Sequence, residues 1–171
     1  MSGTHELDPG SLGDHIDRLY RAAWSLCGSR DDAEDLVQET FARVLSKPRL
    51  LRADDDIGYL LRVLRNTFIS TRRTAARRPH EVPAGDDLEQ LAGSGRPPAE
   101  AWLQADELYA AISALPDDFR DALIAVDVVG LSYGEAARAL KVREATVTTR
   151  LHRARQRVAR AMSVDEPSQK Q

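Results

Sequence analysis

Apolar side chains recur every three or four residues through most of this chain, the spacing that predicts amphipathic helices. The first such stretch begins at Leu12 and ends at Gly28. The second follows Ser29–Asp32, whose side chains favour a helix N-terminus, and it ends at Pro48. A third stretch covers residues 57–77. Because apolar and polar residues nowhere alternate over a length useful for strands, the pattern predicts an all-α fold.

Residues 79–97 interrupt this periodicity with prolines and glycines. Such a composition is typical of a flexible linker, and its length indicates two mobile domains rather than one core. Helical spacing resumes after Pro98 and again after Pro116. We therefore expect two small helical domains, over residues 10–78 and 98–163, joined by that linker.

A helix-turn-helix is predicted near the C-terminus. Ser132 and Glu135 have the spacing of a capping box that opens a short helix. A tight connection leads from there to residues 142–161, which carry six arginines against one acid, Glu144, at helical spacing. In a helix-turn-helix the second helix enters the major groove of DNA. A solvated basic helix on an ordinary bundle is the alternative that the pattern leaves open.

The helix predicted over 57–77 has an apolar side and a cationic side. Tyr59 and Ile69 lie on the cationic side, among arginines. Phosphates need only the arginines, whereas unstacked bases also favour flat or apolar side chains. The pattern is therefore typical of a surface for single-stranded nucleic acid, or of a helix whose Tyr59 and Ile69 contact a neighbouring helix.

The formal net charge of −3 hides an uneven distribution of charged residues. Residues 57–78 carry six arginines and no acid, whereas residues 81–118 carry nine acids and one arginine. Cationic segments on either side of an acidic one predict two separate contacts with a polyanion.

Several classes of protein are disfavoured by the sequence. No nucleophile with a base, paired-carboxylate site or glycine-rich phosphate loop is recognisable, so we expect neither an enzyme nor a cofactor. No Cys/His cluster has the spacing of metal ligands. The single cysteine, Cys27, cannot form an internal disulfide, and no apolar run is long enough to cross a bilayer. We therefore expect a cytoplasmic protein with no membrane insertion.

Three segments in register resemble the extracytoplasmic-function sigma factors, group 4 of the bacterial sigma-70 family. They are DDAEDLVQETFARVL (31–45), GYLLRVLRNTFISTRR (58–73) and LPDDFRDALIAVDVVGLSYGEAARALKVREATVTTRLHRAR (115–155). The resemblance implies that the first domain is sigma region 2, which binds core polymerase and melts and reads the −10 element. It implies that the second domain is sigma region 4, which reads the −35 element. The whole would be a promoter-specificity subunit of RNA polymerase without catalysis of its own.

The resemblance carries over to individual positions. Polymerase binding, against the beta-prime clamp helices, is expected at Asp35, Gln38 and Glu39. Contact with the −10 element is expected at Tyr59, Arg62, Arg65, Asn66, Ile69, Arg72 and Arg73. Contact with the −35 element is expected at Arg143, Glu144, Thr146, Thr149, Arg150 and Arg153. A specificity loop that takes up a flipped −10 base corresponds to about residues 48–56.

Two positions depart from the family pattern. Tyr59 stands where the family usually has tryptophan, and Ala145 stands where it usually has glycine. The expected partners are core RNA polymerase, promoter DNA and an anti-sigma factor. The rival hypotheses are an autonomous helix-turn-helix regulator and an adaptor that imitates a sigma factor to sequester its inhibitor.

Overall fold

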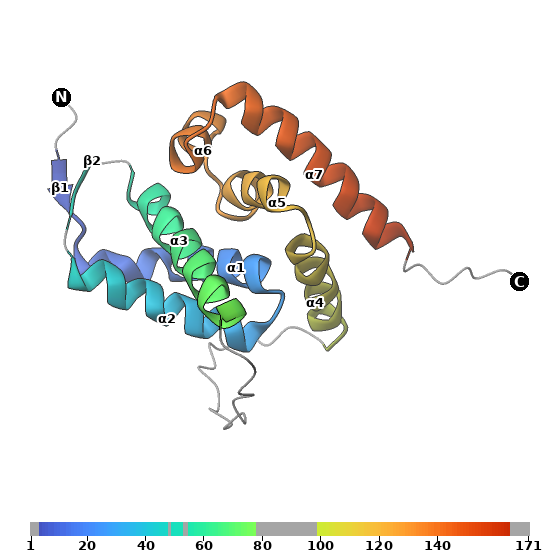
Figure 1. Ribbon diagram of the computed structural model, residues 1–171, viewed down its shortest axis with the longest axis horizontal. Coiled ribbons are helices and arrows are strands. Elements are labelled where there is room, and N and C mark those ends of the chain that lie inside the picture. Colours follow the sequence, from blue (N-terminus) through green and yellow to red (C-terminus); the bar gives the residue numbers. More distant parts are fainter. Residues whose placement is uncertain (1–3, 48, 53–54, 78–98, 165–171) are drawn as a thin grey trace, which may run out of the picture.

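A computed structural model gives the fold and describes residues 4–47, 49–52, 55–77 and 99–164 (Figure 1). Helices dominate these residues, which confirms the predicted all-α class. The helices are α1 (Leu12–Cys27), α2 (Arg30–Ser46), α3 (Asp56–Arg77), α4 (Ala99–Ser113), α5 (Asp117–Leu123), α6 (Tyr133–Leu140) and α7 (Glu144–Val164). The shorter elements are a 3-10 turn η1 (Pro9–Ser11), a π-helical turn η2 (Ile124–Val128), and strands β1 (Thr4–Glu6) and β2 (Leu50–Arg52).

The predicted break between the first two helices is confirmed at Gly28. This residue has φ +71°, and its N–H donates to the carbonyl of Trp24 at 2.7 Å, which ends α1. Ser29 then caps α2 by accepting from the N–H of Asp32 at 3.4 Å. A Cβ at position 28 would lie 2.5 Å from Oγ of Ser113 at the end of α4. Glycine is therefore required here both by the left-handed backbone and by the close approach of α4.

A short β-ribbon lies at the N-terminus and differs from the prediction of a purely helical first half. β1 pairs antiparallel with β2, and Thr4 lies opposite Arg52. A three-residue strand has too few positions to produce a recognisable alternation, so the sequence pattern missed it. The ribbon is anchored by the buried side chain of Leu51 and by a hydrogen bond of 3.2 Å between Nε2 of His5 and Oδ2 of Asp56.

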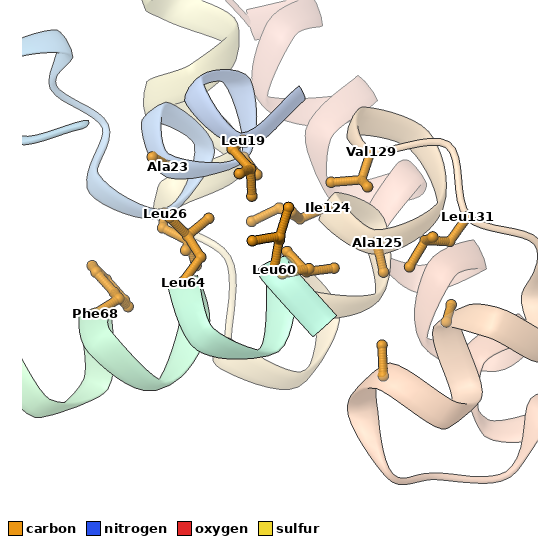
Figure 2. Close-up of a cluster of buried hydrophobic side chains, with 14 of the residues drawn as sticks. Leu19, Ala23, Leu26, Leu60, Leu64, Phe68, Ile124, Ala125, Val129 and Leu131 are labelled. Atoms are coloured by element: carbon orange, nitrogen blue, oxygen red, sulfur yellow. The ribbon is translucent and has the colours of Figure 1, made fainter. Parts of the chain in front are cut away.

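The two predicted helical domains do not keep separate cores in this structure but pack against each other. A single continuous cluster of buried apolar side chains includes residues of α1 to α3 and of α4 to α7. Figure 2 shows Ile124 of η2 lying among Leu19 of α1 and Leu60 and Leu64 of α3. The predicted linker, residues 79–97, lies outside the described residues. The C-terminal helices pack on the N-terminal bundle through contacts of α4 and η2 with α1 and of α6 with α3.

The two cationic helices occupy different places in this arrangement. α3 contacts α6, so it lies between the N-terminal bundle and the C-terminal helices. α7 packs on α4, α5 and α6, and Figure 1 shows it on their outer side, away from α3. Part of one cationic helix therefore lies at the contact between the N-terminal bundle and the C-terminal helices, and the other helix faces outward.

Candidate nucleic-acid and partner interfaces

The first turns of α3 form one wall of a cavity of about 380 Å³. Tyr59 lines it together with Leu45 of α2 and Arg49 before β2. The guanidinium of Arg62 lies 6.0 Å from the centre of the Tyr59 ring and donates to the carboxylate of Asp55 at 2.9 Å. An aromatic ring and two arginines therefore lie at or beside a cavity at this end of the helix.

Tyr59 and Ile69 are both half-buried and pack against the hydrophobic cluster. Part of each side chain therefore packs against the core, which agrees with the interpretation that these residues contact neighbouring helices. Tyr59 also lines the cavity described above. The sequence placed both residues on the cationic side without showing that α3 has neighbours there.

Arg65 makes a contact that the sequence did not predict. Its Nε donates to Oδ2 of Asp121 on α5, and its side chain is 35% exposed against 7% for Asp121. Burial raises the pKa of Asp121, although its attraction to Arg65 and Arg120 opposes that shift. This ion pair joins the N-terminal bundle to the C-terminal helices.

The C-terminal half of α3 is more accessible. Asn66, Arg72 and Arg73 are exposed. The guanidinium of Arg72 lies 5.5 Å from the centre of the Phe68 ring, where it covers an apolar surface and keeps its charge in solvent. Of the predicted −10 contacts on α3, these three are the fully exposed ones.

A larger groove of about 710 Å³ runs between α2, α3 and the end of α4. Asp35 and Glu39 lie along its α2 side, and Leu36 and Phe68 contribute apolar surface. Gln38 is exposed on the same helix but does not line the groove. The three predicted polymerase contacts are therefore all accessible, and two of them border a groove lined by acidic, basic and apolar side chains.

Cys27 also lines this groove but is poorly suited to react. Burial, with a smaller contribution from Asp32, raises the pKa of Cys27 to about 12. The thiolate is the reactive form of cysteine, so at neutral pH this side chain behaves as a small apolar group.

The helix-turn-helix is formed as predicted. Ser132 Oγ accepts from the N–H of Glu135 at 3.3 Å, and Glu135 Oε2 accepts from the N–H of Ser132 at 2.7 Å, which is the reciprocal capping box. Hydrogen bonds to its carboxylate from the side chain and the backbone N–H of Ser132 lower the pKa of Glu135. Lys141 then takes φ +57° at the end of α6, which makes the turn into the long helix.

α7 buries the face predicted from its spacing, including Val147, Leu151 and Ala154. Its exposed side holds four of the six predicted −35 contacts, and the other two are half-buried. The exposed four are Arg143, Glu144, Thr149 and Arg153, and the half-buried two are Thr146 and Arg150.

Acids of α5 and η2 hold the basic helix in place. Arg150 lies 2.8 Å from the carboxylate of Asp118, and Arg155 binds both oxygens of Asp127 at 2.8 and 2.6 Å. The sequence showed the arginines but not these partners, because the acids lie about 30 residues away and come close only in the fold. Two arginines of α7 thus orient the helix within its own domain.

The structure brings the predicted residues together in three groups rather than one site. The α2 residues border the large groove, the α3 residues follow the inner helix, and the α7 residues follow the outer helix. Among the described residues no cluster of His, Cys, Asp or Glu could hold a metal ion. Over the same residues no helix is both long and apolar enough to cross a membrane.

Known proteins are similar to this chain in sequence and in fold. Residues 12–78 match Sigma-70 region 2, and residues 105–158 match Sigma-70, region 4. The ECF RNA polymerase sigma factor SigE of Mycolicibacterium smegmatis is 38% identical over 149 residues, which are 84% of this chain and 57% of that protein. The chain thus spans little more than half of that relative's length.

Two further similarities extend over most of both chains. The ECF RNA polymerase sigma factor EcfG of Rhodopseudomonas palustris is 35% identical over 151 residues, covering 88% of this chain and 82% of that protein. The sigma factor RpoE of Bartonella quintana, solved with the anti-sigma factor NepR, superposes with a TM-score of 0.65 at 26% identity, covering 93% of this chain and all of the other. The chain belongs to the extracytoplasmic-function RNA polymerase sigma factors, which are non-catalytic subunits that direct transcription from promoters.

Proposed function

We propose that this chain binds core RNA polymerase through α2 and directs it to promoters by reading two elements with two different helices. The observation that carries the proposal is the contrast between those helices. α3 has an aromatic ring and arginines beside a cavity, whereas α7 is the outward second helix of a helix-turn-helix. The first arrangement suits unpaired bases, and the second suits duplex DNA.

The −10 element is read, in this proposal, by the N-terminal part of α3. A flipped base would enter the cavity beside Tyr59 and stack on its ring. Arg49 and Arg62 would then supply positive charge for the phosphate of that nucleotide. Unstacking a base costs a few kcal/mol, and a preformed pocket offsets that cost. Of the predicted specificity loop, positions 48 and 53–54 lie outside the described residues.

The −35 element is read by the exposed side of α7. Arg143 and Glu144 stand at the start of the helix, where side chains reach base edges best, and Arg153 lies further along the same exposed side. Arg150 forms an ion pair with Asp118. We therefore assign it the roles of orienting the helix and of contacting phosphate.

Polymerase binding is assigned to the exposed polar edge of α2. Asp35 and Glu39 present carboxylates beside apolar surface, a combination that fits the basic clamp helices of the largest subunit. We also propose an anti-sigma partner, because the RpoE of Bartonella quintana was solved with one. Since RNA polymerase is cytoplasmic, we place the protein in the cytoplasm.

Assembly with sigma-free polymerase followed by run-off transcription tests the whole proposal. The Asp35→Ala/Glu39→Ala double variant should bind core polymerase about tenfold more weakly or worse, because two charge contacts are lost. Glu34→Ala is the matched control, since Glu34 is an exposed acid of the same helix outside the predicted contacts. Both proteins should keep the helical content of the parent chain.

The outcomes separate the proposal from its rivals. An autonomous regulator would bind promoter duplex without polymerase and would not support initiation. A sigma mimic would bind an inhibitor but neither polymerase nor DNA. Failure of the purified chain to co-migrate with sigma-free polymerase, in the absence of any inhibitor, would refute the proposal.

A further inference from the structure

The N-terminal segment, residues 4–9, forms part of the cavity in which we place the flipped −10 base. Four consecutive residues of this segment line the cavity together with Tyr59, namely Glu6, Leu7, Asp8 and Pro9. The segment precedes residues 12–78, the part of the chain that matches Sigma-70 region 2. Because the sequence predicted −10 contacts only within residues 48–73, a contribution from the N-terminus was not expected.

The β-ribbon attaches this segment to the predicted specificity loop and to α3. β1 pairs with β2, which lies within that loop, and Glu6 is opposite Leu50 (Figure 1). The hydrogen bond between His5 and Asp56 joins β1 to the first residue of α3. Leu7 is buried in the hydrophobic cluster. The segment is therefore held against two of the parts that form the rest of the cavity.

The two acids of the cavity differ in what they bind. Oδ1 of Asp8 accepts from the N–H of Gly10 at 3.0 Å, so Asp8 caps the turn η1. Glu6 is exposed, and among the described residues no hydrogen bond or ion pair engages its carboxylate. Glu6 is therefore the acid of this cavity whose whole carboxylate is available to a ligand.

A carboxylate at this place restricts which base the cavity can accept. It repels phosphates and carbonyl oxygens, so it favours binding only where a base donates a hydrogen bond to it. A flipped base is read through its Watson–Crick edge, and cytosine, adenine and guanine each carry an amino group there. The donor of thymine on this edge lies between two carbonyl oxygens, which the carboxylate would repel. An acid in the cavity therefore discriminates against thymine.

We propose that Glu6 determines the specificity of this cavity by accepting a hydrogen bond from the amino group of the flipped base. Thymine, which has no amino group, is disfavoured. The inference rests on the −10 base contact proposed above and adds the chemical class of the base. It also makes the N-terminal segment a part of the −10 reader, because β1 holds Glu6 beside the specificity loop.

The test uses holoenzyme assembled from the full chain and sigma-free polymerase. The probe is a pool of DNA strands of about 15 nucleotides with random central positions, and the bound strands are sequenced. The parent holoenzyme should disfavour thymine about tenfold at one position. Glu6→Gln should reduce this discrimination to about twofold or less at the same position, because the amide of glutamine can donate to a carbonyl oxygen.

Two variants serve as controls. Asp14→Asn removes a charge from an exposed acid of α1 that does not line the cavity, so the base preference should not change. Tyr59→Ala should weaken the preference at the same position for all bases, because the stacking surface is lost. Circular dichroism should show the helical content of the parent chain in each variant.

A second measurement removes the donor from the DNA instead of the acceptor from the protein. The preferred base is replaced by its analogue without the amino group, in a strand of otherwise unchanged sequence. This replacement should weaken binding of the parent holoenzyme about tenfold. It should have no further effect on Glu6→Ala, because the two changes remove the same hydrogen bond.

Each remaining outcome has a distinct meaning. A preference that is lost in Tyr59→Ala but kept in Glu6→Gln would overturn the role of Glu6 and leave the proposed base cavity standing. Unchanged base preference in both variants, with transcription initiation intact, would overturn the cavity and the inference with it. Weaker binding of Glu6→Gln to all strands alike would assign Glu6 a structural role only, and this would overturn the inference. A parent holoenzyme that accepts thymine equally at every position would do the same.

Discussion

The two cationic helices of this sigma factor differ in the location of the acidic residues that pair with their arginines. On α7 the ion pairs of Arg150 and Arg155 are made with acids of the same domain, Asp118 and Asp127. On α3 the ion pair of Arg65 is made with an acid of the other domain. Pairs within a domain fix the orientation of a helix and survive when the domains separate, whereas a pair between domains is lost.

The two helices also differ in exposure. Arg143, which directly precedes α7, and Arg153 of α7 are exposed. Tyr59 and Arg65 of α3 are half-buried by their neighbours. This arrangement of the chain therefore presents its predicted duplex reader while it covers part of its predicted strand reader. Four predictions test this comparison, and they follow in order of decreasing expected effect.

The largest expected effect comes from the buried side chain that joins the domains. Ile124→Ala should lower the free energy of unfolding by about 2–5 kcal/mol, because it leaves a cavity at a position that is 1% exposed. Since Ile124 packs against α3, the loss should also separate the unfolding of the two domains. Calorimetry should then show two transitions in place of one.

Leu151→Ala is the matched control for that variant. Leu151 is also 1% exposed, but it lies on α7, which does not form the contact with α3. It should destabilise region 4 by a similar amount without loosening its contact with region 2. If both variants lower the stability equally and neither splits the transition, the interface contributes no cooperativity.

The second prediction concerns readout by the outer helix. Arg153→Ala should weaken binding of the holoenzyme to duplex carrying the −35 element by about 1–3 kcal/mol if Arg153 contacts a base. Binding to a random duplex should change less, and opening of the −10 region, followed by permanganate reactivity, should remain. An equal loss on both duplexes would show that Arg153 contacts phosphate instead.

Local signals in the sequence predicted much of this structure. Gly28, Ser29 and the Ser132–Glu135 box determine helix ends through contacts a few residues away, so their patterns could be recognised directly. The buried face of α7 could likewise be predicted from the helical spacing of its apolar residues.

The features that distinguish α3 from α7 depend on contacts distant in sequence. Asp121 is one acid among many in the sequence, and only the packing of α5 on α3 brings it to Arg65. Arg120 was not expected to be buried, because an arginine is usually exposed unless the fold supplies partners such as Phe68 and Asp117. The predicted DNA and polymerase contacts themselves remain predictions.

The smallest expected effect lies at the capping box, on the α7 side of the comparison. Ser132→Ala should cost about 0.5–2 kcal/mol of stability, because the N–H of Glu135 loses its acceptor. Region 4 should weaken as a duplex reader, while strand binding at α3 should stay unchanged.

The pH dependence of Glu135→Gln gives an independent measure of the same box. Because folding lowers the pKa of Glu135, its charged form contributes stability above the unfolded pKa of about 4.3, and this contribution is lost as the pH falls through the folded pKa. The difference in unfolding free energy between the parent chain and Glu135→Gln should therefore be present at pH 7 and shrink below about pH 4. A difference that stays constant from pH 7 to pH 3, measured by urea unfolding, would mean that the carboxylate charge plays no part in the cap. The box would then hold α6 by hydrogen-bond geometry alone.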